Sequence, residues 1–399
     1  HVSNLEGGGG LNLSHRLLRG GVKLSLTYLL VPCHSNSLLF PRKLKKYGFS
    51  TKACKLVRSF LSGRFQTTEV SKNGRKYHSN FTPSTAGVAQ GSLLGPLLFL
   101  IYINDLPDFL EDNGIDLQTV IYADDINVVV KGVDIENKIK WVIDRVNKWV
   151  EDNNLKLNFD KTFILNFTKN ILDFQSVKIG DKEIQTDQTV KYLGFFIDQQ
   201  LNWHSHAKHI EKKIASRAFA IRKLNRKIDR ESLMLYYHSN VDSIISYGIQ
   251  LWGYTTGARD ILLTQKKILR IIANKKKFDS CRKLFPEFNV MTVFSRYIYS
   301  TIKESIKLGY ITKEKLITNN QIQTRNILAK IEKKGGEKVD WDSLESRGIR
   351  YFNKLPKPLK ELFIKSENSN LFLNNIKNYF IENPFYELKE YLDTNLPNP

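Results

Sequence analysis

Two adjacent aspartates, Asp124 and Asp125, stand between two apolar, β-branched runs of the chain. Residues 119–121 (Thr-Val-Ile) precede them and residues 128–130 (Val-Val-Val) follow, and such runs are typical of strands. Because successive side chains of a strand point to opposite faces, both carboxylates can reach one site only if the chain turns there. Carboxylate oxygens in such a turn are hard ligands suited to Mg²⁺. The alternative is a plain polar hairpin turn, since Asp is common in turns.

Three further motifs surround the acidic pair in a characteristic order. Residues 87–99 read GVAQGSLLGPLLF, residues 155–162 read LKLNFDKT and residues 190–198 read VKYLGFFID. Together with the acidic pair, they resemble the motifs of reverse transcriptases from non-LTR, LINE-type or jockey-like retrotransposons. The resemblance extends from about Leu38 to about Leu308. It implies an α+β fold: a right-hand polymerase palm (an antiparallel sheet with packed helices), partial fingers, a helical thumb and a helical C-terminal region.

The resemblance also implies roles for individual residues. Asp124 would ligate the catalytic metal ions, Mg²⁺ or Mn²⁺, and Asp125 would contribute more weakly. Tyr122 would contact the primer or template backbone, and Ala123 would leave room for the primer end. Two groups of residues complete the implied nucleotide and primer sites: Gln90, Gly91 and Ser92 against the incoming nucleotide and its templating base, and Tyr192, Leu193 and Gly194 as the primer grip.

Lys161 lies near the end of the motif at residues 155–162 and is also implicated by the resemblance. It would lie near the triphosphate and could donate a proton to the leaving pyrophosphate. Without the motif order, a solvated lysine at the end of a strand is the simpler interpretation.

One carboxylate expected in this family is missing. An early palm strand supplies an aspartate, next to an aromatic residue, and a pair of metal ions needs it beside the acidic hairpin. The segment that follows this strand is recognisable at residues 34–49, yet residues 28–33, where Phe-Asp is expected, read Tyr-Leu-Leu-Val-Pro-Cys. No aspartate precedes Asp105. Residues 1–33 are therefore predicted to be an atypical segment, truncated or misread, and the chain is expected to extend a primer only at background rate.

The charge of the chain favours a polyanionic partner. Its 61 Lys and Arg against 40 Asp and Glu leave a net charge of +21, which suits nucleic acid or an anionic membrane surface. The longest apolar run, residues 93–103, contains Gly and Pro and is too short to span a bilayer. The three cysteines are far apart and form no CxxC pair, which fits a reducing compartment.

A long basic amphipathic helix is predicted from Ala207 to Arg230, because apolar residues recur there at helical spacing with cations between them. In the family this helix begins the thumb, which grips the primer–template duplex. A solvated helix face is the alternative, and calmodulin or membrane binding is less favoured. The candidate contacts with the nucleic-acid backbone are Lys212, Lys213, Arg217, Arg222 and Arg226.

Periodicity and the resemblance together predict the remaining elements and a division into four parts. An apolar stripe predicts a helix at 139–150 that ends near residues 153–154, helices are also expected at 51–62, 241–252 and 265–277, and strands are expected at 64–70, 155–167 and 190–197. The resemblance places a helix at 93–106, whereas that apolar run alone could equally be a buried strand. His204, His206 and His209 resemble a zinc cluster only superficially, since no Cys is near. The expected parts are 1–33 (atypical), 34–200 (partial fingers and palm), 201–329 (thumb and post-thumb) and 330–399 (charged linker and helical tail).

The sequence therefore predicts an RNA-directed DNA polymerase domain of a non-LTR retrotransposon. Its partners would be an RNA template, a DNA primer and deoxynucleoside triphosphates, without a membrane, in the nucleus or a cytoplasmic ribonucleoprotein. One alternative is a catalytically dead remnant that only binds nucleic acid. A polymerase like group II intron maturases or telomerase is less favoured, and the sequence predicts no oligomeric state.

Overall fold

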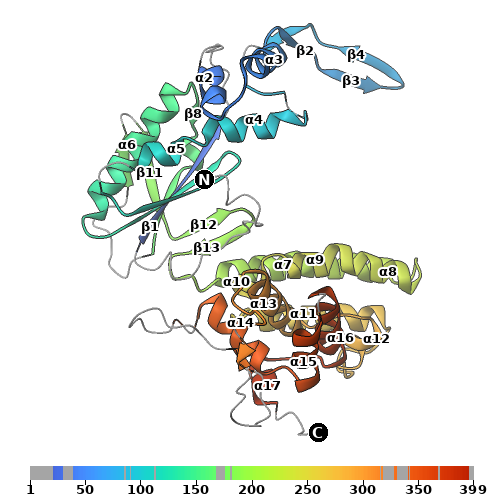
Figure 1. Ribbon diagram of the computed structural model, residues 1–399. Helices are drawn as coiled ribbons and strands as arrows, with labels where there is room; N and C mark the ends of the chain where they lie inside the picture. The colour runs from blue at the N-terminus through green and yellow to red at the C-terminus, as the bar shows by residue number, and fades with distance from the viewer. Residues whose placement is uncertain are drawn as a thin grey trace. The chain divides into compact units, whose positions relative to one another are not determined.

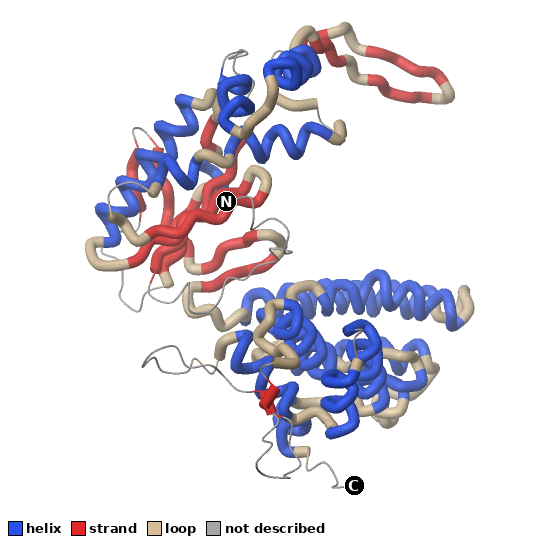
Figure 2. Tube along the Cα trace, in the orientation of Figure 1, coloured by secondary structure: helices blue, strands red, loops and turns tan. Residues whose placement is uncertain are grey.

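In the computed structural model, residues Leu18–Val190 form one compact unit, and residues Lys191–Pro399 belong to a second (Figure 1). Strands and helices are mixed in the first unit, whereas helices dominate the second (Figure 2). The α+β class predicted from the sequence is confirmed. The structure describes residues 21–29, 39–84, 87–89, 91–111, 114–167, 176–179, 182–314, 316–317, 328–329, 340, 342–366 and 369–394.

A seven-stranded sheet forms the core of the first unit, in the order β10-β11-β9-β1-β7-β6, with β8 paired to β1. β1 (Gly21–Leu29) lies in the middle and is antiparallel to both β7 (Asp125–Lys131) and β9 (Phe163–Asn166). The other pairs are antiparallel except β11 with β9, which is parallel. The remaining strands are β6 (Leu117–Tyr122), β8 (Lys156–Leu157), β10 (Ser176–Ile179) and β11 (Lys182–Asp187).

β1 lies within residues 1–33, the segment that was predicted to be atypical. Those residues were set apart because they carry no motif, yet residues 21–29 form the central strand of the sheet. The strand follows from its composition: in Val22 to Tyr28, apolar and polar residues alternate for most of the length, which is the period of a strand. The two compact units divide at Val190 and Lys191.

One helix supplies most of the apolar side chains that cover the sheet. α6 (Ile135–Asp152) buries the stripe from which it was predicted, and it ends next to Asn153 as expected. The stripe packs with the apolar residues of β7, such as Val128 and Val130. Each such side chain contributes roughly 2 kcal/mol when fully buried, so this interface holds β7 rigidly in the sheet. The buried residues of the stripe are Ile139, Val142, Ile143, Val146, Trp149 and Val150.

A smaller apolar cluster joins three further helices of the first unit, around Leu44, Cys54, Val57 and Leu98. The helix expected at 51–62 is confirmed. The helix expected at 93–106 is interrupted at Asn104 and Asp105 and forms two. The cluster joins α2 (Leu39–Lys46), α3 (Thr51–Leu61) and α4 (Leu94–Ile103), whereas α5 (Leu106–Leu110) packs into the larger cluster under the sheet.

Three of the expected strands are interrupted. The run 64–70 contributes to β2 (Arg64–Gln66) and β3 (Glu69–Lys72), which pair with β5 (Thr82–Ser84) and β4 (Arg75–His78) respectively. The run 155–167 contains β8, the 3₁₀ turn η2 (Phe159–Lys161) and β9. The run 190–197 is a hairpin of β12 (Thr189–Tyr192) and β13 (Phe195–Asp198). Its two turn residues, Leu193 and Gly194, have φ of +45° and +84°, as a tight hairpin turn requires.

The basic helix predicted from Ala207 to Arg230 is shorter than expected. α7 (His204–Leu224) ends at Leu224, and Asp229 starts a new helix by accepting a hydrogen bond from the backbone N–H of Ser232 at 2.8 Å. The expected helix 241–252 is likewise divided, and the expected helix 265–277 is part of one that begins earlier and ends at Ile272. The helices that follow α7 are α8 (Arg230–Tyr237), the π-helical η3 (His238–Asp242), α9 (Ser243–Ser246), α10 (Ile249–Trp252), α11 (Ala258–Ile272), α12 (Leu284–Glu287) and α13 (Val293–Lys307).

The helical tail predicted for residues 340–399 packs onto α13 and shares its core. For example, the buried Thr292 hydroxyl donates a hydrogen bond to the Phe385 carbonyl at 2.5 Å. The predicted linker at 330–338 lies outside the described residues. The elements of this part are β14 (Leu316–Ile317), β15 (Leu328–Ala329), α14 (Leu344–Asn353), α15 (Lys357–Lys365), α16 (Ser369–Glu382) and α17 (Leu388–Asp393).

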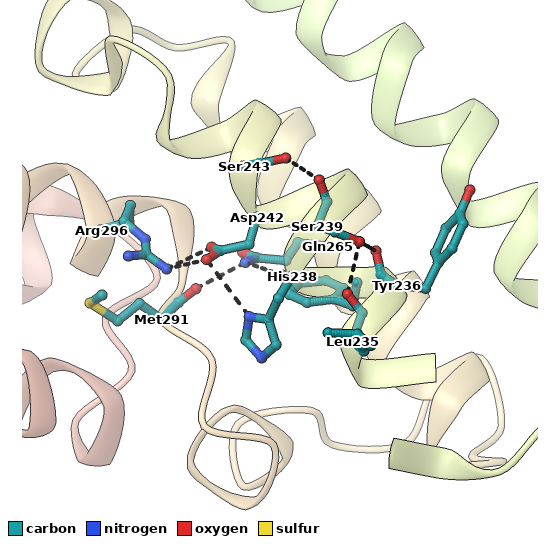
Figure 3. A network of polar contacts seen from close by, with 10 residues as sticks. Leu235, Tyr236, His238, Ser239, Asp242, Ser243, Gln265, Met291 and Arg296 are labelled. Carbon is teal, nitrogen blue, oxygen red and sulfur yellow. Dashed lines mark hydrogen bonds and ion pairs between the residues drawn. The ribbon is translucent and has the colours of Figure 1, made fainter. Parts of the chain in front are cut away.

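Two neighbouring groups of polar contacts, one around Asp242 and one around Gln265, connect helices of the second unit (Figure 3). Arg296 on α13 donates to both carboxylate oxygens of Asp242, at 2.7 and 2.5 Å, and His238 lies 3.8 Å from the same carboxylate. Burial alone would raise the pKa of Asp242, but His238 and Arg296 outweigh it and hold that pKa below its ordinary value. Beside this pair, the buried Gln265 amide donates to the Tyr237 hydroxyl at 2.8 Å and to the Met291 carbonyl at 2.9 Å.

Candidate active site

The two adjacent aspartates lie at a tight hairpin. Tyr122 at the end of β6 pairs directly with Asp125 at the start of β7, and Ala123 and Asp124 form the turn. Asp124 and Tyr122 are exposed, and Asp125 is half-buried. The turn predicted between the two β-branched runs is confirmed, and it holds both carboxylates within one reversal of the chain.

Ala123 adopts an unusual backbone conformation in this turn. Its φ is +50°, a left-handed region that costs a residue with a Cβ roughly 1 kcal/mol. Residues held in such regions occur preferentially at functional sites, where the surrounding structure enforces them. Here β7, buried along most of its length, supplies that constraint.

β1 runs alongside the acidic hairpin. In the antiparallel register of β1 and β7, Thr27 lies directly opposite Asp125, and Ser25 lies opposite Asn127. Directly opposed residues of antiparallel strands have Cβ atoms about 5 Å apart. Position 27 is therefore the place on β1 nearest to the second aspartate. Among the described residues, no group of three His, Cys, Asp or Glu side chains is arranged to hold a metal ion.

Of the residues expected against the incoming nucleotide, Gln90 lies outside the described part of the chain, and Gly91 and Ser92 form a turn before α4. Gly91 has φ +82°. The Ser92 hydroxyl donates to the Ala89 carbonyl at 2.7 Å and accepts from the N–H of Gly95 at 3.0 Å. These contacts start the helix. The contact with a nucleotide stays a prediction.

Lys161 is exposed and ends the 3₁₀ turn between β8 and β9. Both of these strands pair with β1, and Leu157 lies opposite Tyr28. The motif around Lys161 therefore borders the same central strand as the acidic hairpin. Its role at the triphosphate stays a prediction.

The residues expected to form the primer grip lie in the second unit, at the β12–β13 turn. The Tyr247 hydroxyl donates to the Leu193 carbonyl at 2.8 Å, and the Tyr247 ring stacks on Phe195 with centroids 4.8 Å apart. Next to this stack, Gly248 has φ +55°, and a Cβ there would lie 2.3 Å from the Phe195 ring. The tip of the hairpin is thus fixed by packing that only a glycine at position 248 permits.

The expected backbone contacts also lie in the second unit. Four of these cations are exposed, Arg217 is half-buried, and Arg226 lies beyond the end of α7. On the same helix His206 is fully buried, with its ring near Phe195, Trp203 and Trp252. Burial, with smaller effects of His209 and Lys213, lowers the pKa of His206 to about 4. His206 is therefore a neutral core residue, whereas His204 is exposed.

Comparison with known proteins shows which family the sequence around this hairpin is similar to. Residues 40–197 match the sequence family described as reverse transcriptase (RNA-dependent DNA polymerase). The chain is 30% identical over 230 residues to the RNA-directed DNA polymerase from mobile element jockey of Drosophila melanogaster. The aligned region covers 55% of this chain and 25% of that protein. It is 25% identical over 252 residues to the probable RNA-directed DNA polymerase from transposon X-element of the same species, covering 60% and 27%. The chain spans about a quarter of the length of these relatives.

A solved structure of telomerase from Candida albicans, in complex with a TWJ fragment of telomeric RNA, covers 72% of this chain and 49% of that one at 12% identity. Its TM-score of 0.28 is too low to support any argument. No helix in the described part of the chain is long and apolar enough to cross a membrane.

The acidic hairpin lies within residues 40–197, the part of the chain that is similar to reverse transcriptases. The resemblance to jockey-like, non-LTR retrotransposon enzymes indicated by the motifs is confirmed. The family match begins at residue 40 and so does not include β1. The motifs could not reveal β1, the strand beside the aspartates. The alternation of apolar and polar residues in β1 is the signal that could have predicted it.

Proposed function

We propose that this chain is the polymerase portion of a non-LTR retrotransposon protein, in which the β6–β7 hairpin is the catalytic centre. The reaction would be attack of a primer 3′-hydroxyl on a deoxynucleoside triphosphate, directed by an RNA template. The observation that carries the proposal is the exposed Asp124 at a strained turn, inside the region that matches reverse transcriptases. The flanking sheet would act as the palm and the helices after β13 as the thumb.

The hairpin carboxylates suit divalent metal ions only in part. Asp124 and Asp125 offer the oxygen ligands that Mg²⁺ or Mn²⁺ prefers. Two bound ions would activate the attacking hydroxyl and neutralise the leaving pyrophosphate. Such a pair needs a further carboxylate, and no third acidic side chain joins the two within the described residues. We infer that Thr27 occupies the position from which the missing aspartate would act, because its register places it opposite Asp125.

This inference makes the chain a weak polymerase as it stands. Loss of a metal ligand removes interactions that matter most in the transition state, so rate should suffer more than binding. The same observation favours the second candidate function, a remnant that binds a primer–template without extending it. The two candidates differ in whether a carboxylate at position 27 restores extension.

The test is primer extension on an RNA template with Mg²⁺, using the full chain. We expect background extension by the unmodified chain, clear extension by Thr27→Asp, and loss of that gain in Thr27→Asp/Asp124→Asn. Thr27→Asn is the matched control, because it has the same shape without the charge. Strong Asp124-dependent extension by the unmodified chain would show that another residue supplies the carboxylate. Binding without extension by Thr27→Asp would favour the remnant.

A further inference from the structure

Lysines and arginines from two distant segments meet at one end of the helical unit. α7 and α11 pack side by side (Figure 1). Asn225, the first residue after α7, donates its side-chain amide to the Ile271 carbonyl at 2.9 Å and to the Asn274 side chain at 2.8 Å. The loop after α11 is thereby fixed beside the end of α7. The exposed cations of this end surface are Arg222, Lys223, Arg226, Lys227, Lys275, Lys276 and Lys277.

Helix-end electrostatics account for only a small part of this charge. Cations stabilise helix C-termini, and each of the two ends carries roughly half a negative charge. Asp229 and Asp279 are the acidic residues in the two segments, 222–229 and 274–279. Set against seven cations, these negative charges leave an excess of about four positive charges. None of the seven forms an ion pair with any residue that the structure describes. The surplus suits a polyanion.

Two exposed aromatic rings accompany the cations. Phe278 is 89% exposed and Phe219 is 61% exposed. The ammonium of Lys277 lies 5.3 Å from the Phe278 ring centroid, and that of Lys223 lies 5.6 Å from the Phe219 ring centroid. Sites for single-stranded nucleic acid combine these two features: cations follow the phosphates, and aromatic rings stack on unpaired bases.

We propose that the end surface, residues 222–227 with 274–279, binds an unpaired stretch of RNA. The proposal rests on the proposed function for the class of partner, and it adds a single-strand contact to the duplex grip expected of α7. Duplex bases are already stacked on one another and cannot lie on Phe278. An anionic membrane fits less well, because two rings bury little apolar area compared with the apolar face of a membrane-binding helix.

The first test uses fluorescence anisotropy of the full chain with a labelled oligouridylate of about 12 nucleotides, a length typical of single-strand sites. Replacing Lys275, Lys276 and Lys277 together by Ala should weaken binding and flatten the slope of log K against log salt by about 2. The matched control replaces three exposed lysines on other elements, Lys303, Lys354 and Lys389, by Ala, and should leave the slope unchanged. An equal effect of both triple variants would overturn the proposal.

The second test isolates stacking at Phe278. Phe278→Leu should weaken oligouridylate binding about tenfold, because an aliphatic side chain cannot stack, whereas Phe278→Trp should retain it. Neither change should alter binding to a blunt RNA–DNA duplex. Unchanged oligouridylate binding by Phe278→Leu overturns the proposal. The proposal is also overturned if Phe278→Leu loses affinity for phosphatidylserine vesicles but keeps its affinity for RNA. Primer extension is not a readout here, so failure of this proposal leaves the polymerase proposal standing, and the reverse also holds.

Discussion

Thr27 on β1, the central strand of the sheet, lies directly opposite Asp125 on the neighbouring strand β7. The pairing brings a segment without motifs directly beside the acidic hairpin. Under the proposed function, position 27 is the place from which a carboxylate would complete a set of three acidic residues. The expected aspartate can therefore be tested by a substitution at one position, residue 27.

Metal affinity should rise when position 27 becomes acidic. A carboxylate about 4 Å from a divalent ion in a solvated site adds roughly 2 kcal/mol of attraction. We expect Thr27→Asp to bind Mn²⁺ about thirtyfold more tightly than the unmodified chain, measured by electron paramagnetic resonance of free Mn²⁺. Thr27→Asn should show no gain, and Asp124→Asn should reverse the gain. Equal affinity of Thr27→Asp and Thr27→Asn would place the missing ligand elsewhere.

The packing of the β12–β13 hairpin should depend on glycine at position 248. Gly248 and Gly309 both have positive φ, +55° and +72°, but only at Gly248 would a Cβ collide, 2.3 Å from Phe195. Gly309→Ala should cost about 1 kcal/mol from backbone strain alone, and Gly248→Ala about 3 kcal/mol because overpacking adds to it. In calorimetry the Tm of the helical unit should fall by about 3 °C and about 9 °C respectively. Similar shifts for both variants would argue against the close packing.

Stability of the helical unit should fall in mild acid because of His206. Burial lowers its pKa from 6.5 to about 4, so between these values the unfolded chain binds a proton that the folded chain does not. Stability is therefore complete above about pH 6.5 and decreases as pH falls towards 4, by up to about 3 kcal/mol. Urea midpoints at pH 7.5 and pH 5, followed by tryptophan fluorescence, measure this. His206→Phe should flatten the dependence, and an unchanged slope in that variant would assign it to other groups.

The ion pair of Arg296 and Asp242 should matter more than a surface pair. Both side chains are only 16% exposed, and removing one partner leaves a largely buried charge, at a cost of about 3 kcal/mol. Arg296→Gln should show this cost in urea unfolding at neutral pH. Arg230→Gln, which breaks an exposed pair with Glu287, should cost about 1 kcal/mol or less. The pKa of Asp242 is below its ordinary value of 3.8, so the contribution of the pair is lost only as pH falls below about 4. Equal costs for the two variants would contradict the assignment.

Local patterns in the chain were enough to predict the elements that carry the candidate site. The β-branched runs around Asp124 and Asp125 form a hairpin, and the stripe from Ile139 to Val150 forms α6. Both depend on side-chain periodicity and turn chemistry, which act over a few residues. The order of four motifs was likewise enough to indicate the family later matched over residues 40–197.

Contacts between distant segments were decided by packing in three dimensions. Nothing local in residues 21–29 specifies pairing with β7, because register depends on which apolar face the sheet buries against α6. The turn at Leu193 and Gly194 was hidden within an apolar run, and packing against Tyr247 holds it. Lys275 to Lys277 lie beside the end of α7 because α7 packs on α11 and Asn225 joins two segments about fifty residues apart in sequence. Side-chain pattern determines which helices and strands form, whereas burial and hydrogen bonding between them determine which residues meet.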